Sequence, residues 1–173
     1  PDLGRGIELH VASLDASIEV EGNHTELQQC LLNLCLNGIQ AMPDGGTLRL
    51  DATPITLDDK FFAHDEPRAP GPYLQMSISD TGVGMSEDVR KRLFTPFFTT
   101  KAKGTVLGLL SCRLILANHQ GLLRLASEPG KGTTFSIYLP MPAAGDRIAQ
   151  GDVACGHGER VLVVIERESK MVL

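Results

Sequence analysis

The stretch between Thr25 and Met42 most constrains the fold, because its apolar residues recur at intervals of three and four. This spacing predicts an α-helix with one buried face, with Thr25 as the expected N-cap and the PDGG segment as the stop. The stretches 6–12 and 17–21 alternate apolar and polar residues, which predicts two strands with a turn at Asp15. A chain that contains both the two-residue alternation of strands and the three- and four-residue spacing of helices must pack helices against a sheet.

The rest of the chain up to Pro140 continues this mixture of short elements. A Pro- and charge-rich loop is expected over 58–71, and Ser86 is the expected cap of the short helix that comes later. The predicted strands are 47–55, 73–80, 121–128 and 133–140, and the predicted helices are 87–93 and 108–120. This order predicts an α+β fold, a two-layer sandwich whose mixed sheet carries helices on one face.

The domain organisation follows from length and composition. With 173 residues, the chain can form one compact domain and a tail, and we expect the domain to span residues 1–140. Residues 141–159 are Ala, Gly, Pro and polar residues with little periodicity, which is typical of a linker. The apolar run after them predicts a strand that starts a second, truncated unit over 160–173.

Composition also excludes several classes of partner. The net charge is −5 and the basic residues cluster only at 90–92, so we expect no nucleic-acid partner. No apolar run approaches the length needed to span a bilayer, so we expect no direct membrane contact. The four cysteines, Cys30, Cys35, Cys112 and Cys155, lack the spacing of a zinc site or a disulfide framework. These features together predict a cytoplasmic, reduced protein.

Asp80 is the first candidate for a functional side chain. Leu74, Met76 and Ile78 share one strand face by the two-residue period, and Asp80 continues that row. Its carboxylate should therefore point towards the helix layer, where a charge needs a partner. The alternative is a turn residue that bonds the backbone ahead of Gly82.

Asn33 and Asn37 lie four residues apart and therefore stack on one face of the predicted helix. Two amides in so apolar a helix either satisfy each other or form part of a site. An amide oxygen is a ligand that suits Mg²⁺, which is usually shared with substrate phosphates.

Glycines mark two loops where a ligand could approach the backbone. Gly82 and Gly84 permit conformations that other residues avoid. The KGTVLGLL segment at 103–110 opens a helix, and the amides of a helix start can hold phosphates. Each of these signals alone is weak.

Five motifs occur in order along the chain: NLCLNGIQAM, SDTGVGM, LFTPFFTTK, GTVLGL and SEPGKGTTFSIYLP. Together they resemble the ATP-binding catalytic domain of sensor histidine kinases, which has the Bergerat fold shared by gyrase, heat-shock chaperones and mismatch-repair proteins. The resemblance covers about residues 5–140. It implies that ATP and Mg²⁺ are the cofactors, with Asn37 as the metal ligand. The nucleotide-binding set that it implies is Asn33, Asn37, Gln40, Asp80, Gly82, Gly84, Met85, Lys101, Gly104, Thr105, Leu107, Gly108, Leu109 and Thr133.

The resemblance also implies roles for particular residues. Asp80 would accept a hydrogen bond from the adenine amino group, and Thr133 would help to fix the base. The cluster of Phe94, Phe97 and Phe98 would anchor one end of the ATP lid and could meet the helical domain that carries the phosphoacceptor histidine.

No histidine of the chain stands in the acidic motif that surrounds a phosphoacceptor in this family. The five are His10, His24, His64, His119 and His157. The resemblance therefore implies a domain with no catalytic residue of its own, which would phosphorylate a separate dimerisation domain. The implied partners are that domain and a response regulator or receiver, and the implied full-length kinase is a homodimer. The resemblance also allows the chain to be the cytoplasmic part of a membrane sensor.

The chain departs from the family pattern at several positions. Val106 stands where relatives have glycine, which predicts strain in the lid, and Leu110 replaces a small hydroxyl residue. Gln40 stands where many relatives have a basic residue. The tail resembles the first strand of a receiver, but Ile165 and Glu166 provide only half of its acidic pair.

Two other functions remain open at this point. An ATP hydrolase of the same superfamily would carry a carboxylate base at the position of Asn33, and an amide cannot take a proton from water. A non-catalytic pseudokinase or interaction module is the second alternative, and Val106 is the residue that motivates it.

Overall fold

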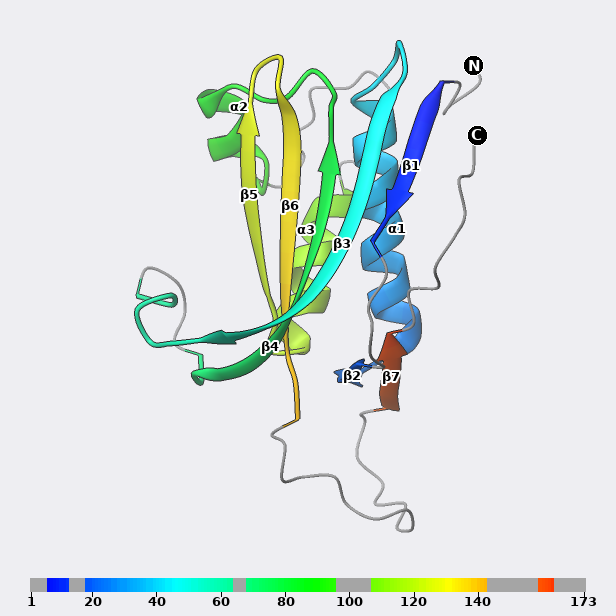
Figure 1. The fold of residues 1–173 in the computed structure, drawn as a ribbon. Coiled ribbons are helices and arrows are strands. Elements are labelled where there is room, and N and C mark those ends of the chain that lie inside the picture. Colours follow the sequence, from blue (N-terminus) through cyan, green and yellow to red (C-terminus); the bar gives the residue numbers. More distant parts are fainter. Residues whose placement is uncertain (1–5, 13–17, 64–67, 96–106, 143–158, 164–173) are drawn as a thin grey trace.

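A computed structural model describes residues 6–12, 18–63, 68–95, 107–142 and 159–163 of the chain (Figure 1). Its helices are α1 (His24–Gln40), α2 (Glu87–Arg92) and α3 (Leu107–Asn118). Its strands are β1 (Ile7–Val11), β2 (Ile18–Gly22), β3 (Gly46–Leu57), β4 (Gly71–Asp80), β5 (Leu122–Glu128), β6 (Gly132–Pro140) and β7 (Glu159–Val163). None of the helices in these ranges is long and apolar enough to cross a membrane.

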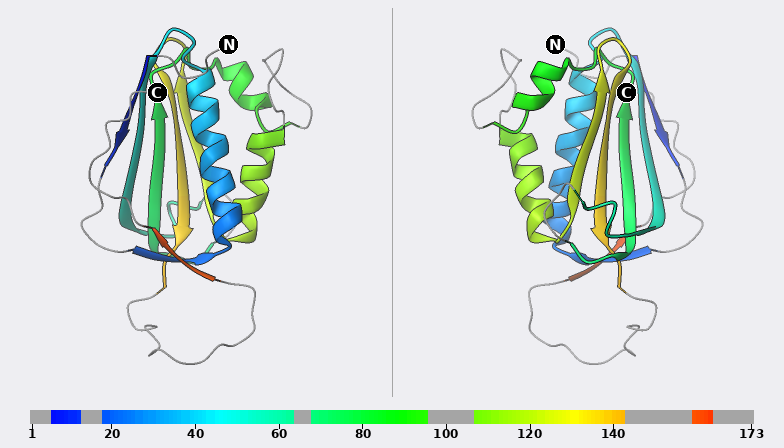
Figure 2. Two further views of the ribbon diagram at one scale, coloured as in Figure 1. Left: turned by 90° about the vertical axis from the view of Figure 1, so that its right-hand side faces the viewer. Right: turned by 90° about the vertical axis from the view of Figure 1, so that its left-hand side faces the viewer.

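The main sheet has five strands in the order β1-β3-β4-β6-β5. β1 runs parallel to β3, and the other neighbours are antiparallel, so the sheet is mixed. Figure 2 shows α1 and α3 side by side on one face of this sheet. The predicted α+β sandwich with helices on one face is confirmed.

The main core fills the space between these two helices and the sheet. Leu34 and Leu116 from the helices, and Leu74 and Ile137 from the sheet, are at most 1% exposed. The buried positions of α1 recur at three and four, as the sequence predicts. A helix that presents one such apolar stripe to a sheet is fixed in rotation about its own axis, and this decides which of its polar residues face the end of β4.

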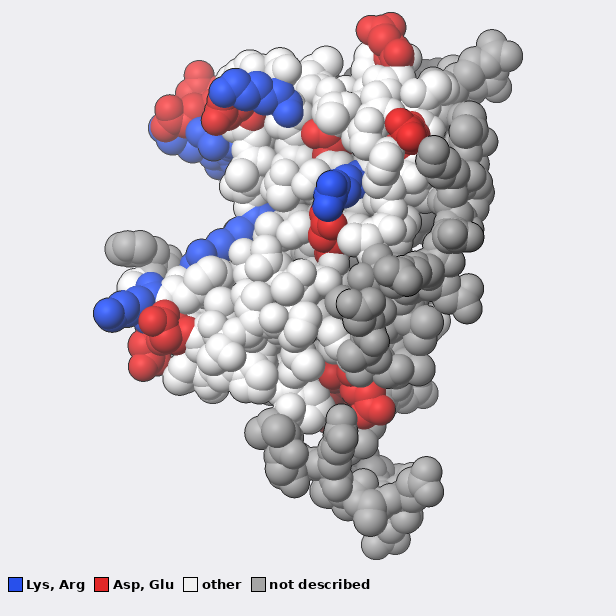
Figure 3. Space-filling view, viewed as in Figure 1, with Lys and Arg blue, Asp and Glu red and all other residues white. Residues whose placement is uncertain are grey.

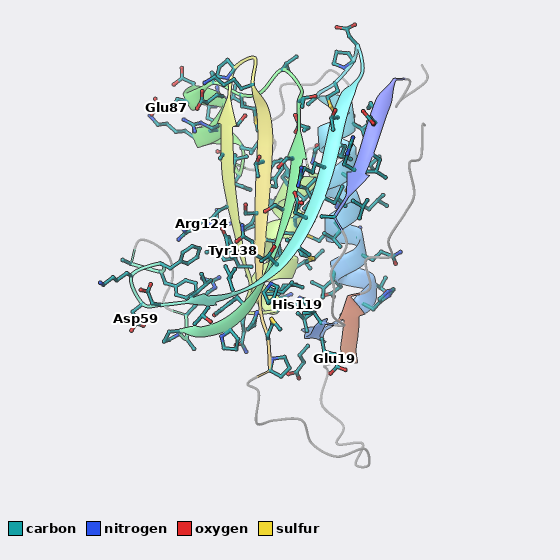
Figure 4. The ribbon with its side chains drawn as sticks, in the orientation of Figure 1. Glu19, Asp59, Glu87, His119, Arg124 and Tyr138 are labelled. Carbon is teal, nitrogen blue, oxygen red and sulfur yellow. The ribbon has the colours of Figure 1, made fainter. Side chains whose placement is uncertain are left out.

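The opposite face of the sheet carries a smaller cluster where the β3–β4 hairpin extends beyond the helices. Its buried part consists of Leu57, Phe62, Tyr73 and Tyr138. The guanidinium of Arg124, a residue labelled in Figure 4, lies 3.6 Å from the centroid of the Phe61 ring. Figure 3 shows that Lys and Arg do not gather into one patch on this side of the molecule. The cluster closes the far end of the sheet, away from Asp80.

The structure corrects the predicted start of the first helix. Asn23, with an extended backbone, is the N-cap, and its Oδ1 accepts from the backbone N–H of Glu26 at 3.1 Å. Thr25 was expected in this role, but it lies inside the first turn. Asn and Thr both cap well, so the choice depends on backbone dihedrals and not on residue type alone.

The two N-terminal strands do not pair with each other. β1 joins the main sheet, whereas β2 pairs antiparallel with β7 in a separate two-stranded sheet, with Ile18 opposite Val163. The expected turn at Asp15 lies outside the described residues. β7, which begins at the last residue of the expected linker and continues into the expected tail, therefore pairs with β2.

His119, just after α3, ties the end of α3 to the start of α1 (Figure 4). Its Nε2 accepts from the backbone N–H of Asn23 at 2.9 Å, and its Nδ1 lies 2.7 Å from the Ile115 carbonyl oxygen, so Nδ1 donates there. An added Cβ on Gly22 would come within 2.6 Å of the imidazole Cδ2. The glycine is what allows this ring to fit.

We expect His119→Ala to lower the free energy of unfolding by about 1–3 kcal/mol, because it removes a hydrogen bond between two helix ends and leaves a gap beside Gly22. Urea unfolding followed by circular dichroism measures this. His24→Ala, at an exposed position of α1, is the matched control and should change little. If both substitutions lower the free energy of unfolding equally, His119 does not link the end of α3 to the start of α1.

Candidate functional site

Asp80 lies at the end of β4, where the sheet meets α1. The residue is 7% exposed, and its Oδ1 accepts from the backbone N–H of Gly82 at 2.9 Å. A Cβ added to Gly38 of α1 would lie 3.6 Å from the other carboxylate oxygen, Oδ2. The carboxylate therefore points towards the helix layer, and it also makes the local turn contact that was the alternative.

Thr133 is directly opposite Asp80 in the register between β4 and β6. Its Oγ1 is 2.9 Å from the Oγ of Ser127 on β5, and both residues are buried. Ser127 Oγ accepts from the backbone N–H of Met85 at 2.8 Å and donates to the Gly132 carbonyl oxygen at 3.1 Å. Ser127 therefore fixes both Thr133 and the loop after β4. Sequence reasoning did not select it, although it opens the SEPGKG motif.

The loop after β4 is held between the end of α1 and the turn that joins β5 to β6. Val83 donates its backbone N–H to the Ala41 carbonyl oxygen at 3.0 Å and accepts from the Gly130 N–H at 2.8 Å. Gly82 faces Ala41 so closely that a Cβ would come within 2.5 Å of that oxygen. Gly84 has φ of +64°, and a Cβ there would collide with the Glu128 carbonyl. Both glycines are required by close backbone contacts.

Asn33 and Asn37 lie one turn apart on α1, and both are partly buried. A Cβ added to Gly108 would be 3.7 Å from Asn33 Cγ, so the first turn of α3 lies against this amide. Gln40, in the last turn of α1, is exposed. The two asparagines thus line the side of α1 that runs from α3 towards the end of β4.

Three more expected residues fall in or near the described ranges. The backbone of Leu107 begins α3, and Leu109 packs against the main core. The ring centroid of Phe94 lies 5.4 Å from the guanidinium carbon of Arg113, which joins the end of α2 to α3. The remaining expected residues lie outside the described residues, and they are Lys101, Gly104, Thr105, Val106, Phe97 and Phe98.

The arrangement combines three chemical features at one end of the sandwich. A buried carboxylate and a hydroxyl come from neighbouring central strands, a glycine loop exposes backbone beside them, and two amides come from the covering helix. A buried acceptor of this kind can read an amino group on a flat base. Amide oxygens and the start of a helix can receive a metal ion and phosphates.

Comparison with known proteins agrees with this geometry. The model of the family described as histidine kinase-, DNA gyrase B-, and HSP90-like ATPase matches residues 22–143. Sporulation kinase A of Bacillus subtilis is 36% identical over 135 residues, which cover 78% of this chain and 20% of that protein. The chain therefore spans about a fifth of the length of that relative.

Solved structures show the same fold. The mycobacterial sensor histidine kinase MprB superposes with a TM-score of 0.61 at 25% identity, covering 79% of this chain and 83% of that one. Full-length ShkA, solved in complex with AMPPNP, gives a TM-score of 0.61 at 26% identity, covering 80% of this chain and 26% of that one. With a family model that matches most of its length, the chain belongs to the histidine kinase-, DNA gyrase B- and HSP90-like ATPase family.

Proposed function

We propose that this chain is the ATP-binding catalytic domain of a sensor histidine kinase, which transfers the γ-phosphoryl group of ATP to a histidine on a separate helical domain. The observation that carries the proposal is the convergence of Asp80, Thr133 and the Gly82–Gly84 loop at the end of β4 and the start of β6. These residues belong to motifs far apart in the sequence. The family match and the kinases among its relatives support the same function.

The base-binding role rests on Asp80. One carboxylate oxygen is engaged by the Gly82 N–H, and the other faces α1 beside Gly38. The carboxylate would accept from the adenine amino group, and Thr133, held by Ser127, would support the same edge of the base. Gly82 and Gly84 would let the backbone run beside the ring.

The metal-binding role belongs to Asn37, with Asn33 in support. Asn37 is only partly buried, so its amide oxygen can reach a ligand, and amide oxygens fit Mg²⁺. When bound, the ion would neutralise charge on the outer phosphates. Asn33 occupies the position of a carboxylate base, and its amide cannot accept a proton from water, so phosphoryl transfer is favoured over hydrolysis.

The remaining residues belong to the proposed nucleotide-binding set. We assign Gln40, Gly108 and the backbone of Leu107 to the phosphates, and we place the apolar Met85 and Leu109 in the set without a phosphate contact. Lys101, Gly104 and Thr105 complete the proposed set.

The partners follow from the same function. The phosphoacceptor histidine would lie on a dimerisation domain, a response regulator or receiver would take the phosphoryl group next, and the full-length kinase would be a homodimer. We propose residues 1–140 as the catalytic domain, 141–159 as a linker and 160–173 as the start of a receiver-like unit.

Calorimetric titration tests the proposal directly. The chain should bind ATP more tightly than GTP, because guanine presents a carbonyl oxygen where adenine presents its amino group. It should then transfer labelled phosphate to an added histidine-bearing helical domain and not to its own histidines. Equal affinity for the two nucleotides would overturn the adenine assignment, and ATP binding without phosphotransfer would favour the pseudokinase alternative.

Asn37→Ala should remove the Mg²⁺ dependence of ATP binding and weaken binding in Mg²⁺ by about tenfold or more, because one oxygen ligand is lost. Titrations with and without Mg²⁺ measure this. Asn118→Ala, at the exposed end of α3, is the matched control. If Asn37→Ala unfolds, the amide of Asn37 has a structural role. If the variant folds and the Mg²⁺ dependence is unchanged, Asn37 is not the metal ligand.

A further inference from the structure

Two cysteines lie next to each other between α1 and α3, one helical turn from Asn33 of the proposed nucleotide site. Cys30 of α1 and Cys112 of α3 are both 0% exposed, and both are free thiols. The Sγ of Cys112 donates to the Cys30 carbonyl oxygen at 3.4 Å. The third free cysteine among the described residues, Cys35, is only partly buried. The pairing joins positions far apart in the sequence.

We propose that Cys30 and Cys112 form a dithiol site that a peroxide oxidises to a disulfide linking α1 to α3. Both side chains come from helices that pack in one core, so the Cys112 sulfur is held against Cys30. The sulfurs of a disulfide lie about 2.05 Å apart, much closer than two thiols in contact. The bond therefore requires α3 to move slightly towards α1.

The reaction balances with hydrogen peroxide as the oxidant. The Cys112 sulfur attacks one peroxide oxygen, the O–O bond breaks, and the thiol proton leaves with the released hydroxide as water. The Cys30 sulfur then attacks the sulfenic sulfur, the S–O bond breaks, and the second hydroxide takes the Cys30 proton as water. Two electrons pass from the two thiols to the peroxide.

The environment of the pair favours Cys112 as the attacking sulfur. A hydrogen bond from the Cys30 thiol, with a further one from the Asn33 side chain, lowers the pKa of Cys112. The hydrogen bond to Cys112, together with burial, raises the pKa of Cys30. A lower pKa gives a larger thiolate fraction, and the thiolate is the nucleophile.

The site is coupled to nucleotide binding through Asn33, and this step rests on the proposed function. Asn33 lies three residues after Cys30 on α1, and a Cβ added to Gly108, four residues before Cys112 on α3, would be 3.7 Å from the Asn33 Cγ. A disulfide that draws α3 towards α1 at Cys112 would displace the first turn of α3, one turn away, from its place against Asn33. Oxidation should therefore weaken ATP binding by about 5- to 150-fold, the usual range for coupled sites.

Peptide mapping tests the disulfide without any nucleotide. The full chain is treated with hydrogen peroxide under native conditions, the remaining thiols are blocked with iodoacetamide, and the unreduced peptides are analysed by mass spectrometry. The expected product joins the Cys30 and Cys112 peptides, is cleaved by dithiothreitol and persists in Cys35→Ala. The cross-linked product should be absent from Cys112→Ala. It should also be absent from Cys30→Ala, which replaces Cys112→Ala in the test if that variant does not fold. Failure of wild-type protein to form this bond at every dose that leaves it folded, or a bond to Cys35 or Cys155 instead, would overturn the proposal.

ATP titration of the reduced and oxidised chain tests the coupling separately. Oxidised wild type and oxidised Cys35→Ala should both bind ATP more weakly, and dithiothreitol should restore the affinity. Equal affinity in the two redox states would exclude the coupling while leaving the disulfide in place. A reduced chain that binds no ATP would instead contradict the proposed function, whatever the peptide map shows.

Discussion

Asp80→Ala is expected to weaken ATP binding by roughly 10- to 150-fold, since a hydrogen bond to a charged group contributes about 1.5–3 kcal/mol. The change removes the buried acceptor at the end of β4 and with it the preference for adenine over guanine. The chain should remain folded, because a buried charge is removed and not introduced. Titration with ATP and GTP measures both effects.

Asp51→Ala provides the matched control for this experiment. Asp51 lies on β3, where it accepts from the Arg49 guanidinium at 2.8 Å, and it is not part of the proposed site. Its loss should leave ATP affinity unchanged. Asp80→Asn adds a finer comparison, since the amide keeps an oxygen for the Gly82 N–H but loses the charge. An Asp80→Ala variant with normal ATP affinity would remove the basis for the adenine assignment.

Gly84→Ala should disrupt the loop after β4 and abolish measurable ATP binding. Its positive φ costs an alanine roughly 1–2 kcal/mol, and the added methyl group would also collide with the Glu128 carbonyl. Backbone atoms of a paired strand cannot move aside cheaply, so the loop must leave its position beside Asp80. Thermal unfolding and ATP titration measure the two consequences.

Gly130→Ala separates the effect of the collision with the Glu128 carbonyl from the effect of a positive φ. Gly130 has φ of +75°, but a Cβ there would meet nothing within 4 Å. It should therefore lose about 1–2 kcal/mol of stability and keep its ATP affinity. If both glycine variants behave alike, the close contact with Glu128 has no role in the site.

The elements with strong periodicity were predictable from sequence. The apolar stripe of α1 and the row that ends at Asp80 both follow from a repeat within one element, and the structure places them as expected. The start of α1 was wrong by two residues, because Asn23 and Thr25 offer equally suitable side chains. Local patterns identify an element better than they identify its first residue.

Contacts between distant segments were not predictable in this way. Nothing in the sequence indicates that β2 pairs with β7, that Ser127 holds Thr133, or that two cysteines of different helices meet. Each depends on how the elements pack. The family resemblance implied a set of site residues, which stays a prediction, and the structure adds side chains such as Ser127 that contact members of this set.

The strand order has a consequence for how the site recognises its ligand. β4 has a hydrogen-bonded neighbour on both sides, and so does β6, whereas the two asparagines lie on a helix that packs on the sheet only through side chains. Backbone amides of such central strands open and exchange with solvent only in the rarest fluctuations. The groups that we assign to the base are therefore preorganised before any ligand arrives. The conformational entropy that is lost on binding is lost mainly by the helix ends that we assign to the phosphates. Selectivity for the base and control of the phosphates can thus vary independently of each other.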